Sequence, residues 1–128
     1  MTSLKLIQNL YNTFQQRDFP AFRKLCAPNI EWVQNPGFPG GATYVGAEAI
    51  IDGVFKRNDA LWRDFQFELE SMNAAGDVVT VIGSYTGKNP STGEPFRASV
   101  AHIYDVADDC VQRFRMFADT HILHQSLS

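Results

Sequence analysis

The sequence predicts an α+β protein in which helices come first and an antiparallel sheet follows. Two observations predict this class. In the first half of the chain, apolar residues recur at three- and four-residue steps, the spacing of one helix face, over residues 4–16, 18–26 and 46–59. In the second half, the alternation and the β-branched residues typical of strands cover residues 65–72, 78–87, 96–106 and 111–120.

Each predicted helix begins with a recognisable signal. Thr2 or Ser3 is placed to cap the first helix. Asp18 is placed to cap the second, where Pro20 falls in the first turn and costs no intrahelical hydrogen bond. In the third, Glu48 lies in the first turn, where a carboxylate complements the helix dipole. The first helix is the most clearly amphipathic, with a stripe formed by Leu4, Ile7, Leu10, Tyr11 and Phe14.

A short strand and an irregular loop separate the second helix from the third. Residues 30–34 alternate, so Ile30, Trp32 and Gln34 are expected on one side of a strand. The loop over residues 35–41 has five Gly or Pro in seven residues, which excludes regular structure. Two interpretations stay open: the loop covers the mouth of a pocket, or it is a plain crossing between strand and helix.

The four later strands are joined by short turns and are expected to form an antiparallel meander. If the last two turn at residues 108–109, His102 falls opposite Arg115, and Ala98 falls opposite Asp119. Paired residues share a face, so His102, Arg115 and Asp119 are expected to project the same way. A histidine, a cation and a carboxylate suit general acid/base catalysis on a small molecule. They also suit a structural role, in which the arginine and the aspartate pair across the sheet.

Other polar side chains are weaker candidates. Tyr44, Tyr85 and Tyr104 can donate a hydrogen bond to a ligand oxygen, although tyrosines at the edge of a core are ordinary. His121 and His124 are three residues apart, but no carboxylate lies at a matching spacing, so no metal site is predicted.

Composition and charge narrow the class of protein further. The 128 residues, 45% of them apolar, are expected to form a single domain over residues 1–128. The net charge of -3, without a cluster of Lys and Arg, argues against a nucleic-acid partner. No apolar run is long enough for a signal peptide or a membrane span, so a cytoplasmic protein is expected. Cys26 and Cys110 lack the spacing of a metal or redox pair and are expected to be free thiols.

The order of helix, helix, short strand, glycine-proline loop, helix and four-strand meander resembles the nuclear transport factor two and ketosteroid isomerase superfamily. Within it, the sequence is most similar to the SnoaL-like proteins, whose founding members are polyketide cyclases. The segments that carry the resemblance are residues 18–29, 31–46 and 92–96, His102, and residues 113–120. The resemblance implies a curved antiparallel sheet wrapped around three helices into a cone-shaped barrel with an internal apolar pocket. It also implies a homodimer formed through the outer face of the sheet.

The resemblance implies a reaction as well. In SnoaL-like cyclases an aspartate near the end of the last long strand is the acid/base, and Asp119 is similar in position, with His102 beside it. This chemistry removes a proton next to a carbonyl and reprotonates an enolate oxygen, and it needs no metal or organic cofactor. Ketosteroid isomerases carry an aspartate base before a proline in the first loop, where this sequence has Asn35. An amide cannot accept that proton at neutral pH, so steroid isomerase activity is not expected.

Two hypotheses follow from the sequence. The first is a cofactor-independent isomerase or lyase of the polyketide cyclase type, acting on an apolar or aromatic carbonyl compound. Its expected catalytic residues are Asp119, His102 and Arg115, and its expected substrate-binding residues are Trp32, Asn35, Tyr44, Phe55 and Tyr85. The second is a non-catalytic module that uses the same cone to bind a small ligand or a partner.

Overall fold

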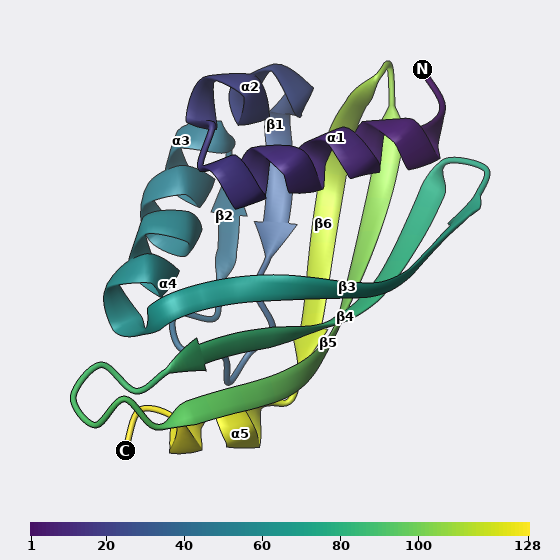
Figure 1. Ribbon diagram of the computed structural model, residues 1–128. Coiled ribbons are helices and arrows are strands. Elements are labelled where there is room, and N and C mark those ends of the chain that lie inside the picture. Colours follow the sequence, from purple (N-terminus) through teal and green to yellow (C-terminus); the bar gives the residue numbers. More distant parts are fainter.

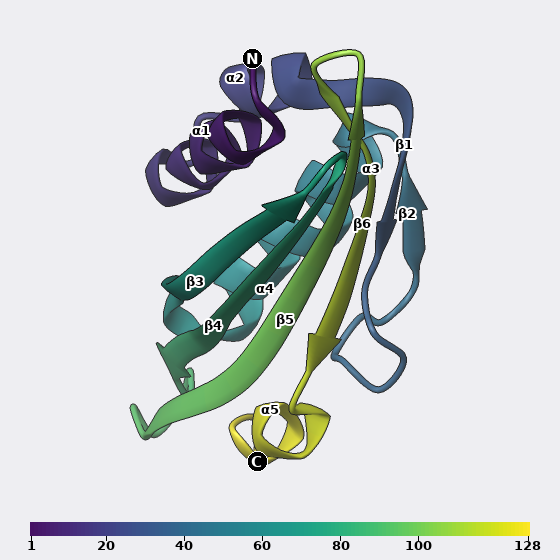
Figure 2. The same ribbon diagram turned by 90° about the vertical axis from the view of Figure 1, so that its right-hand side faces the viewer.

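A strongly curved six-stranded sheet holds the helices against its concave face (Figure 1). The structure, a computed structural model, describes residues 1–128. The strands lie in the order β2-β1-β6-β5-β4-β3, and the sheet is open, with β2 and β3 at its edges. The predicted α+β class and curved sheet are confirmed. The cone is closed by helices rather than by strands, as the side view in Figure 2 shows.

The first two helices form where the sequence predicts them. Helix α1 (Ser3–Gln16) begins at Thr2, whose hydroxyl accepts a hydrogen bond from the Lys5 backbone N–H at 3.1 Å. Its apolar stripe is buried against the sheet, because one face of an amphipathic helix needs an apolar partner. Helix α2 (Phe19–Leu25) begins at Asp18, whose carboxylate accepts from the Ala21 N–H.

The third predicted helix is a continuous helical segment with one wider turn inside it. It consists of α3 (Ala47–Ile50), a π-helical turn (Ile51–Phe55) and α4 (Lys56–Leu61). Single π turns of this kind are often found at functional sites. Here the turn contains Gly53, and a side-chain carbon on Gly53 would lie 2.3 Å from the Tyr44 ring. The absence of a side chain at this position therefore lets the turn pack directly on that tyrosine.

The long strands β3 (Arg63–Ala75), β4 (Val78–Lys88), β5 (Pro95–Ala107) and β6 (Cys110–Ala118) form the predicted meander. Strand β1 (Cys26–Val33) lies beside β6 in parallel orientation. Two elements extend the prediction, namely the edge strand β2 (Thr43–Val45), which pairs with β1, and helix α5 (Thr120–Gln125) after β6. Both are short, so their sequence patterns carry little signal.

The register of the last hairpin differs from the prediction by one residue. The turn is where the sequence places it, with Asp108 and Asp109 both in the left-handed region. A β-bulge between Asp105 and Val106 shifts the pairing, so that His102 faces Met116 rather than Arg115. A shift of one residue moves every side chain to the other face. The expectation that the histidine and the arginine share a face is therefore wrong.

The glycine-proline loop is anchored in the core through Phe38 and does not line the pocket. Phe38 is buried, and its ring centroid lies 6.0 Å from that of Trp62 and 6.1 Å from that of Tyr85. His124 of α5 makes a side-chain contact with the backbone oxygen of Gly37, which ties the loop to the end of the chain. Of the two interpretations of this loop, the plain crossing is the one that fits.

Two further findings concern the chain as a whole. Cys26 and Cys110 are both free thiols. None of the helices combines the length and the apolar character that a membrane crossing requires.

Candidate functional site

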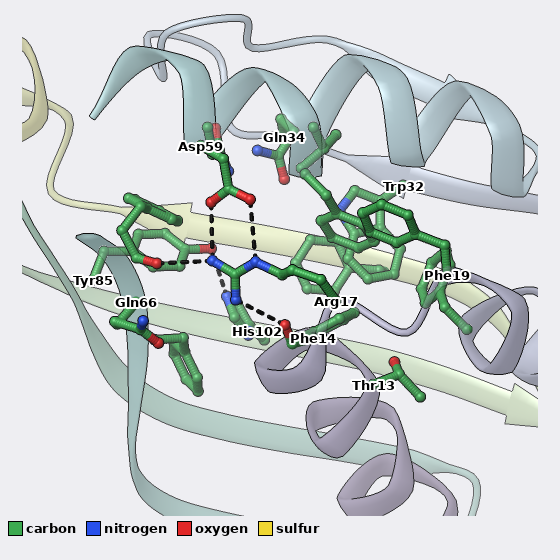
Figure 3. A pocket seen from close by; sticks show the side chains of 17 residues that line it. Thr13, Phe14, Arg17, Phe19, Trp32, Gln34, Asp59, Gln66, Tyr85 and His102 are labelled. Atoms are coloured by element: carbon green, nitrogen blue, oxygen red, sulfur yellow. Dashed lines mark hydrogen bonds and ion pairs between the residues drawn. The ribbon is translucent and has the colours of Figure 1, made fainter. Parts of the chain in front are cut away.

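A pocket lies between the helices and the concave face of the sheet (Figure 3). Its empty space, including the solvent at its mouth, is about 650 Å³. Helices and strands from both halves of the chain contribute to it, so the pocket exists only once the sheet has wrapped around the helical segment. The lining residues are Thr13, Phe14, Arg17, Phe19, Phe22, Trp32, Gln34, Val54, Phe55, Asn58, Asp59, Phe65, Gln66, Phe67, Tyr85, His102 and Phe114.

Aromatic side chains form most of the pocket wall. Trp32 stacks on Phe114, with ring centroids 3.8 Å apart and an interplanar angle of 18°. Phe55 meets Phe22 and Trp32 edge to face. Such contacts hold the rings in fixed orientations and leave their other faces to the pocket. The wall therefore suits a flat, largely apolar molecule.

A chain of hydrogen bonds ends at the buried side of the pocket. Tyr104 donates to the Tyr11 hydroxyl at 2.9 Å, and that hydroxyl lies 2.6 Å from Nδ1 of His102. On the other side of the imidazole ring, Nε2 lies 2.8 Å from the Tyr85 hydroxyl. The four side chains come from α1, β4 and β5, so this network also joins the first helix to the sheet.

The hydrogen-bond partners of His102 favour one of its two neutral tautomers. Burial lowers the pKa of His102 from 6.5 to about 3, so the ring is neutral and carries a single N–H. Because Tyr11 accepts from Tyr104, its own proton goes to Nδ1, and the ring N–H is then on Nε2 and donates to Tyr85. The opposite tautomer would leave the buried Tyr11 proton without an acceptor. The Tyr85 hydroxyl thus keeps its proton for a partner in the pocket.

Burial also keeps the tyrosines of this network protonated. It raises the pKa of Tyr85 above its ordinary value of 10.0. The pKa of Tyr11 is raised for the same reason. Both hydroxyls therefore stay neutral donors over the physiological pH range, and the site offers a proton to a ligand oxygen without carrying a charge itself.

An ion pair spans the mouth of the pocket. Arg17 Nε donates to Asp59 Oδ2 at 3.1 Å, and Arg17 Nη2 donates to Asp59 Oδ1 at 2.9 Å. The same guanidinium donates to the backbone oxygens of Phe14 and Phe65. Arg17 therefore connects α1, α4 and β3 across the opening, as the dashed lines in Figure 3 show. Both side chains are exposed, so this connection can be broken at little cost in stability.

Four of the residues predicted from the sequence line this pocket. They are Trp32, Phe55, Tyr85 and His102. They come from β1, the π turn, β4 and β5, and the structure brings them together on the concave side of the sheet. Whether any of them acts in catalysis stays a prediction.

The other four predicted residues lie outside the pocket. Asp119 is exposed and caps α5, where its carboxylate accepts from the Ile122 N–H at 3.2 Å. Arg115 pairs with Ile103 on the outer face of the sheet, because of the bulge. Asn35 Oδ1 accepts from the Ala118 N–H, and Tyr44 donates to the backbone oxygen of Gly40. The expected convergence of His102, Arg115 and Asp119 is therefore wrong.

Several lining residues were not predicted as site residues, although their positions carry a signal. Gln34 was expected on the same side of its strand as Trp32, and both are buried on the concave face. Asp59 follows Phe55 by four residues, the spacing that places two side chains on one helix face. Tyr11 does not line the pocket but contacts His102, and it belongs to the amphipathic stripe of α1. Arg17 carries no comparable sequence signal, because it acts from the left-handed C-cap of α1, where its φ is 53°.

No group of three or more His, Cys, Asp or Glu side chains is arranged to hold a metal ion. His121 and His124 lie in α5, away from the pocket.

An open curved sheet with helices on its concave face and a pocket between them defines an NTF2-like fold. The sequence profile of the SnoaL-like domain matches residues 7–114, and the chain belongs to this family. Among curated proteins, none matches the chain.

Solved structures show the same fold. An NTF2-like protein from Burkholderia thailandensis is 32% identical, with a TM-score of 0.93 over 98% of this chain and 97% of that one. TerC, co-crystallised with polyporic acid, is 20% identical, with a TM-score of 0.87 over 97% and 96% of the two chains. IdmH from Streptomyces antibioticus, described as a candidate polyketide cyclase, is 19% identical, with a TM-score of 0.84 over 98% of each. The last two show the shared fold alone.

Proposed function

We propose that the chain is a small-molecule enzyme that transfers a proton next to the carbonyl group of an apolar or aromatic compound held in the pocket. The observation that carries this proposal is the 2.8 Å hydrogen bond between the Tyr85 hydroxyl and Nε2 of His102. With the ring proton on Nε2, Tyr85 accepts this bond and its own proton is free for a ligand. A donor of this kind stabilises an enolate oxygen more than the parent carbonyl, because negative charge develops on that oxygen during the reaction.

Asp59 is the base in this proposal, since it is the only carboxylate among the lining residues. Its carboxylate takes the proton from the carbon next to the carbonyl, and the C–H electron pair moves into the enolate. The Tyr85 O–H stabilises the enolate oxygen by a hydrogen bond. Return of the proton to another carbon gives isomerisation, whereas attack of the enolate carbon on a second carbonyl closes a ring. Arg17 has to release Asp59 before the transfer.

The names of two structural relatives support the substrate class. TerC was crystallised with a small organic molecule, and IdmH is described as a candidate cyclase. A cyclase and an isomerase share the enolate that this pocket is suited to stabilise. The aromatic walls of this pocket are consistent with such compounds.

Deuterium exchange into 2-tetralone tests the proposal without knowledge of the natural substrate. This aromatic ketone has exchangeable protons next to its carbonyl, and their loss in D₂O is followed by proton NMR. We expect exchange above the buffer rate, reduced roughly 100-fold or more by Asp59→Asn and about 10- to 100-fold by Tyr85→Phe. Exchange that is unaffected by both substitutions would contradict the proposal.

A second candidate function is a non-catalytic binding module. It is favoured by one observation, namely that both oxygens of Asp59 are occupied by Arg17. His102 is a weak base because burial lowers its pKa to about 3, and both of its ring nitrogens already have hydrogen-bond partners. If 2-tetralone binds but its protons exchange with D₂O no faster than in buffer alone, this alternative is the correct one.

Exposed apolar side chains on the outer face of the sheet are consistent with a homodimer. Ile82, Ala101 and Phe117 are neighbours in one row across β4, β5 and β6. Ile82 is 38% exposed and Phe117 is 51% exposed. A contiguous, exposed apolar row of this kind is typical of an interaction surface. We propose that a second copy of the chain covers it, in the cytoplasm, where the two free thiols stay reduced.

A further inference from the structure

Three buried polar side chains in the pocket have no hydrogen-bond partner in the protein. Trp32 Nε1 and Asn58 Oδ1 are both buried and unpartnered. The amide of Gln34 makes no hydrogen bond to the residues around it in Figure 3. These residues are only 2%, 6% and 3% exposed, respectively, and all three line the same pocket.

Such an arrangement is costly unless something else pairs with these groups. Leaving one buried donor or acceptor unsatisfied costs about 1–3 kcal/mol, and native proteins keep such groups rare. Outside the pocket, one further buried side-chain atom lacks a partner, namely Arg115 Nε on the other face of the sheet. Asn89, which is as deeply buried as Asn58, has its amide nitrogen bonded to the backbone oxygens of Ser126 and Ser128 and its Oδ1 bonded to two backbone N–H groups. Two of the three unsatisfied atoms thus belong to residues that line the pocket.

The chemistry of the three groups defines what would satisfy them. The Trp32 indole can only donate, the Asn58 carbonyl oxygen can only accept, and the Gln34 amide can do both. A hydroxyl group is the smallest ligand group that accepts one hydrogen bond and donates another. A ketone or an ether oxygen can only accept, so it would leave Asn58 Oδ1 unpaired.

The position of the three groups separates them from the Tyr85 hydroxyl. Trp32 lies on β1 and Gln34 directly follows the last residue of that strand, whereas Asn58 lies on α4 beside Asp59. The Tyr85 hydroxyl belongs to β4 and to the hydrogen-bond chain through His102. A ligand with its carbonyl oxygen at Tyr85 therefore meets the three groups with a different part of its ring system.

We propose that Trp32, Gln34 and Asn58 form a subsite for a hydroxyl group, so that the pocket selects hydroxylated aromatic carbonyl compounds over their unsubstituted or methylated counterparts. This inference rests on the proposed function for the placement of the carbonyl group. The inference concerns a hydroxyl group of the substrate that takes no part in the reaction itself.

The test compares ring-hydroxylated 2-tetralones with their methoxy counterparts and with 2-tetralone, by isothermal titration calorimetry on the full chain. We expect at least one hydroxylated compound to bind roughly tenfold or more tightly than both of its counterparts, because a site built around hydrogen bonds discriminates against analogues that lack them. Asn58→Leu and Gln34→Met roughly conserve the shape of the side chain. Each should bring the ratio of the two affinities, hydroxylated over methoxy, close to one.

The free energy of unfolding supplies a second test. If Asn58 stabilised the fold, its replacement would lower this free energy, whereas a residue kept for ligand binding would not show such a loss. Without ligand, Asn58→Leu should leave the free energy of unfolding unchanged or higher, because it removes an unsatisfied acceptor from the interior. The matched control is Asn89→Leu, which removes a satisfied amide outside the pocket. It should lower stability and leave the hydroxyl preference of the remaining folded protein unchanged.

The outcomes separate this inference from the proposed function. If no hydroxylated compound is preferred in the wild-type protein while 2-tetralone binds and exchanges, the hydroxyl subsite is wrong and the proposed function stands. If the preference exists and is lost in Asn58→Leu, but Asp59→Asn and Tyr85→Phe leave exchange unchanged, the subsite stands and the proposed reaction is wrong. A loss of stability in Asn58→Leu as large as that in Asn89→Leu would also overturn the subsite.

Discussion

The Tyr11 hydroxyl lies 2.6 Å from Nδ1 of His102, so the first helix reaches the middle of the sheet through one buried hydrogen bond. Tyr104 donates to the same hydroxyl, which leaves Tyr11 with a single proton and directs it to the imidazole. This hydrogen bond also affects the pocket, because the tautomer of His102 decides whether the Tyr85 hydroxyl donates to a ligand or to the imidazole ring.

The first prediction concerns that tautomer. We expect His102 to be neutral with its proton on Nε2, and to remain so from pH 8 down to about pH 4.5, since burial lowers its pKa to about 3. Long-range ¹⁵N–¹H correlation spectra distinguish the two neutral tautomers and the cation. Tyr11→Phe removes the donor to Nδ1, and it should increase the population of the other tautomer. A wild-type spectrum with the proton on Nδ1 would remove the basis for Tyr85 as a donor.

The second prediction concerns the stability of the fold against acid. In the unfolded chain His102 takes up a proton near pH 6.5, whereas in the folded chain it does so only near pH 3. The unfolded state therefore binds more protons between these values, and stability is full above pH 6.5 and is lost as the pH falls. The loss is at most about 1.4 kcal/mol per pH unit, or on the order of 2–3 kcal/mol by pH 4.5.

Urea unfolding at several pH values between 7 and 4.5 measures this loss. His102→Gln has no titrating ring, so its free energy of unfolding should vary less with pH over the same range. The carboxylates common to both proteins cancel in the difference between the two curves. Parallel curves for wild type and variant would show that His102 does not contribute.

The sequence predicted the fold better than the site, for a physical reason. Element types follow from local periodicity, and the stripes of α1 and the alternation of the long strands are local patterns. Which residues meet depends on register, and one extra residue in β6, opposite the Asp105 region, moved Arg115 to the outer face. Trp32, Phe55, Tyr85 and His102 line the pocket because each lies on the apolar side of its own element.

Asp119 illustrates the other limit of the sequence. In the sequence the strand pattern continues through residue 120, which predicts this aspartate on the same face of the sheet as His102. In the structure β6 ends at Ala118, and Asp119 begins a helix. Aspartate is one of the residues preferred at a helix N-cap, where its carboxylate accepts from a backbone N–H in the first turn. That signal competes with the strand pattern. Because the helix has only six residues, it has too few turns for an apolar periodicity that would favour helix over strand.

The third prediction concerns access to the pocket. Arg17→Asn removes the guanidinium that bridges Asp59 and Phe65 across the opening, and asparagine tolerates the left-handed backbone at this position. We expect faster ligand association, by about threefold or more, and a stability change within about 1 kcal/mol, because the pair is exposed. Stopped-flow fluorescence with 2-tetralone can follow the association through Trp32, which lines the pocket.

The matched control for this prediction is Arg23→Asn. Arg23 also forms an exposed ion pair, with Glu48, but it does not line the pocket. Its removal should leave the association rate unchanged. Equal rates for the wild type and Arg17→Asn would show that the ion pair at the mouth does not limit entry.

The fourth prediction concerns the helical turn that positions Phe55, Asn58 and Asp59. A side-chain carbon at Gly53 would lie 2.3 Å from Tyr44 Cε1, far inside contact distance. Gly53→Ala should therefore lower the free energy of unfolding by about 1–3 kcal/mol, as overpacking does in other cores. Urea denaturation measures the change. In a Tyr44→Ala background the same substitution should cost much less, and an equal cost in both backgrounds would point to backbone strain instead of this contact.

The last prediction concerns the outer face of the sheet. If a second copy of the chain covers the row of Ile82, Ala101 and Phe117, a charge at its most exposed member should weaken the dimer. Phe117→Lys should raise the dissociation constant at least about tenfold, because an unpaired charge would be buried in the interface. Light scattering coupled to size-exclusion chromatography at several protein concentrations measures the change.

Leu69→Lys is the control for this surface, because Leu69 is 54% exposed but lies on the edge strand β3, away from the row. It should leave the dimer intact. A wild-type chain that is monomeric at every concentration would contradict the proposed dimer. Dissociation by both substitutions would place the interface at a larger or different part of the sheet.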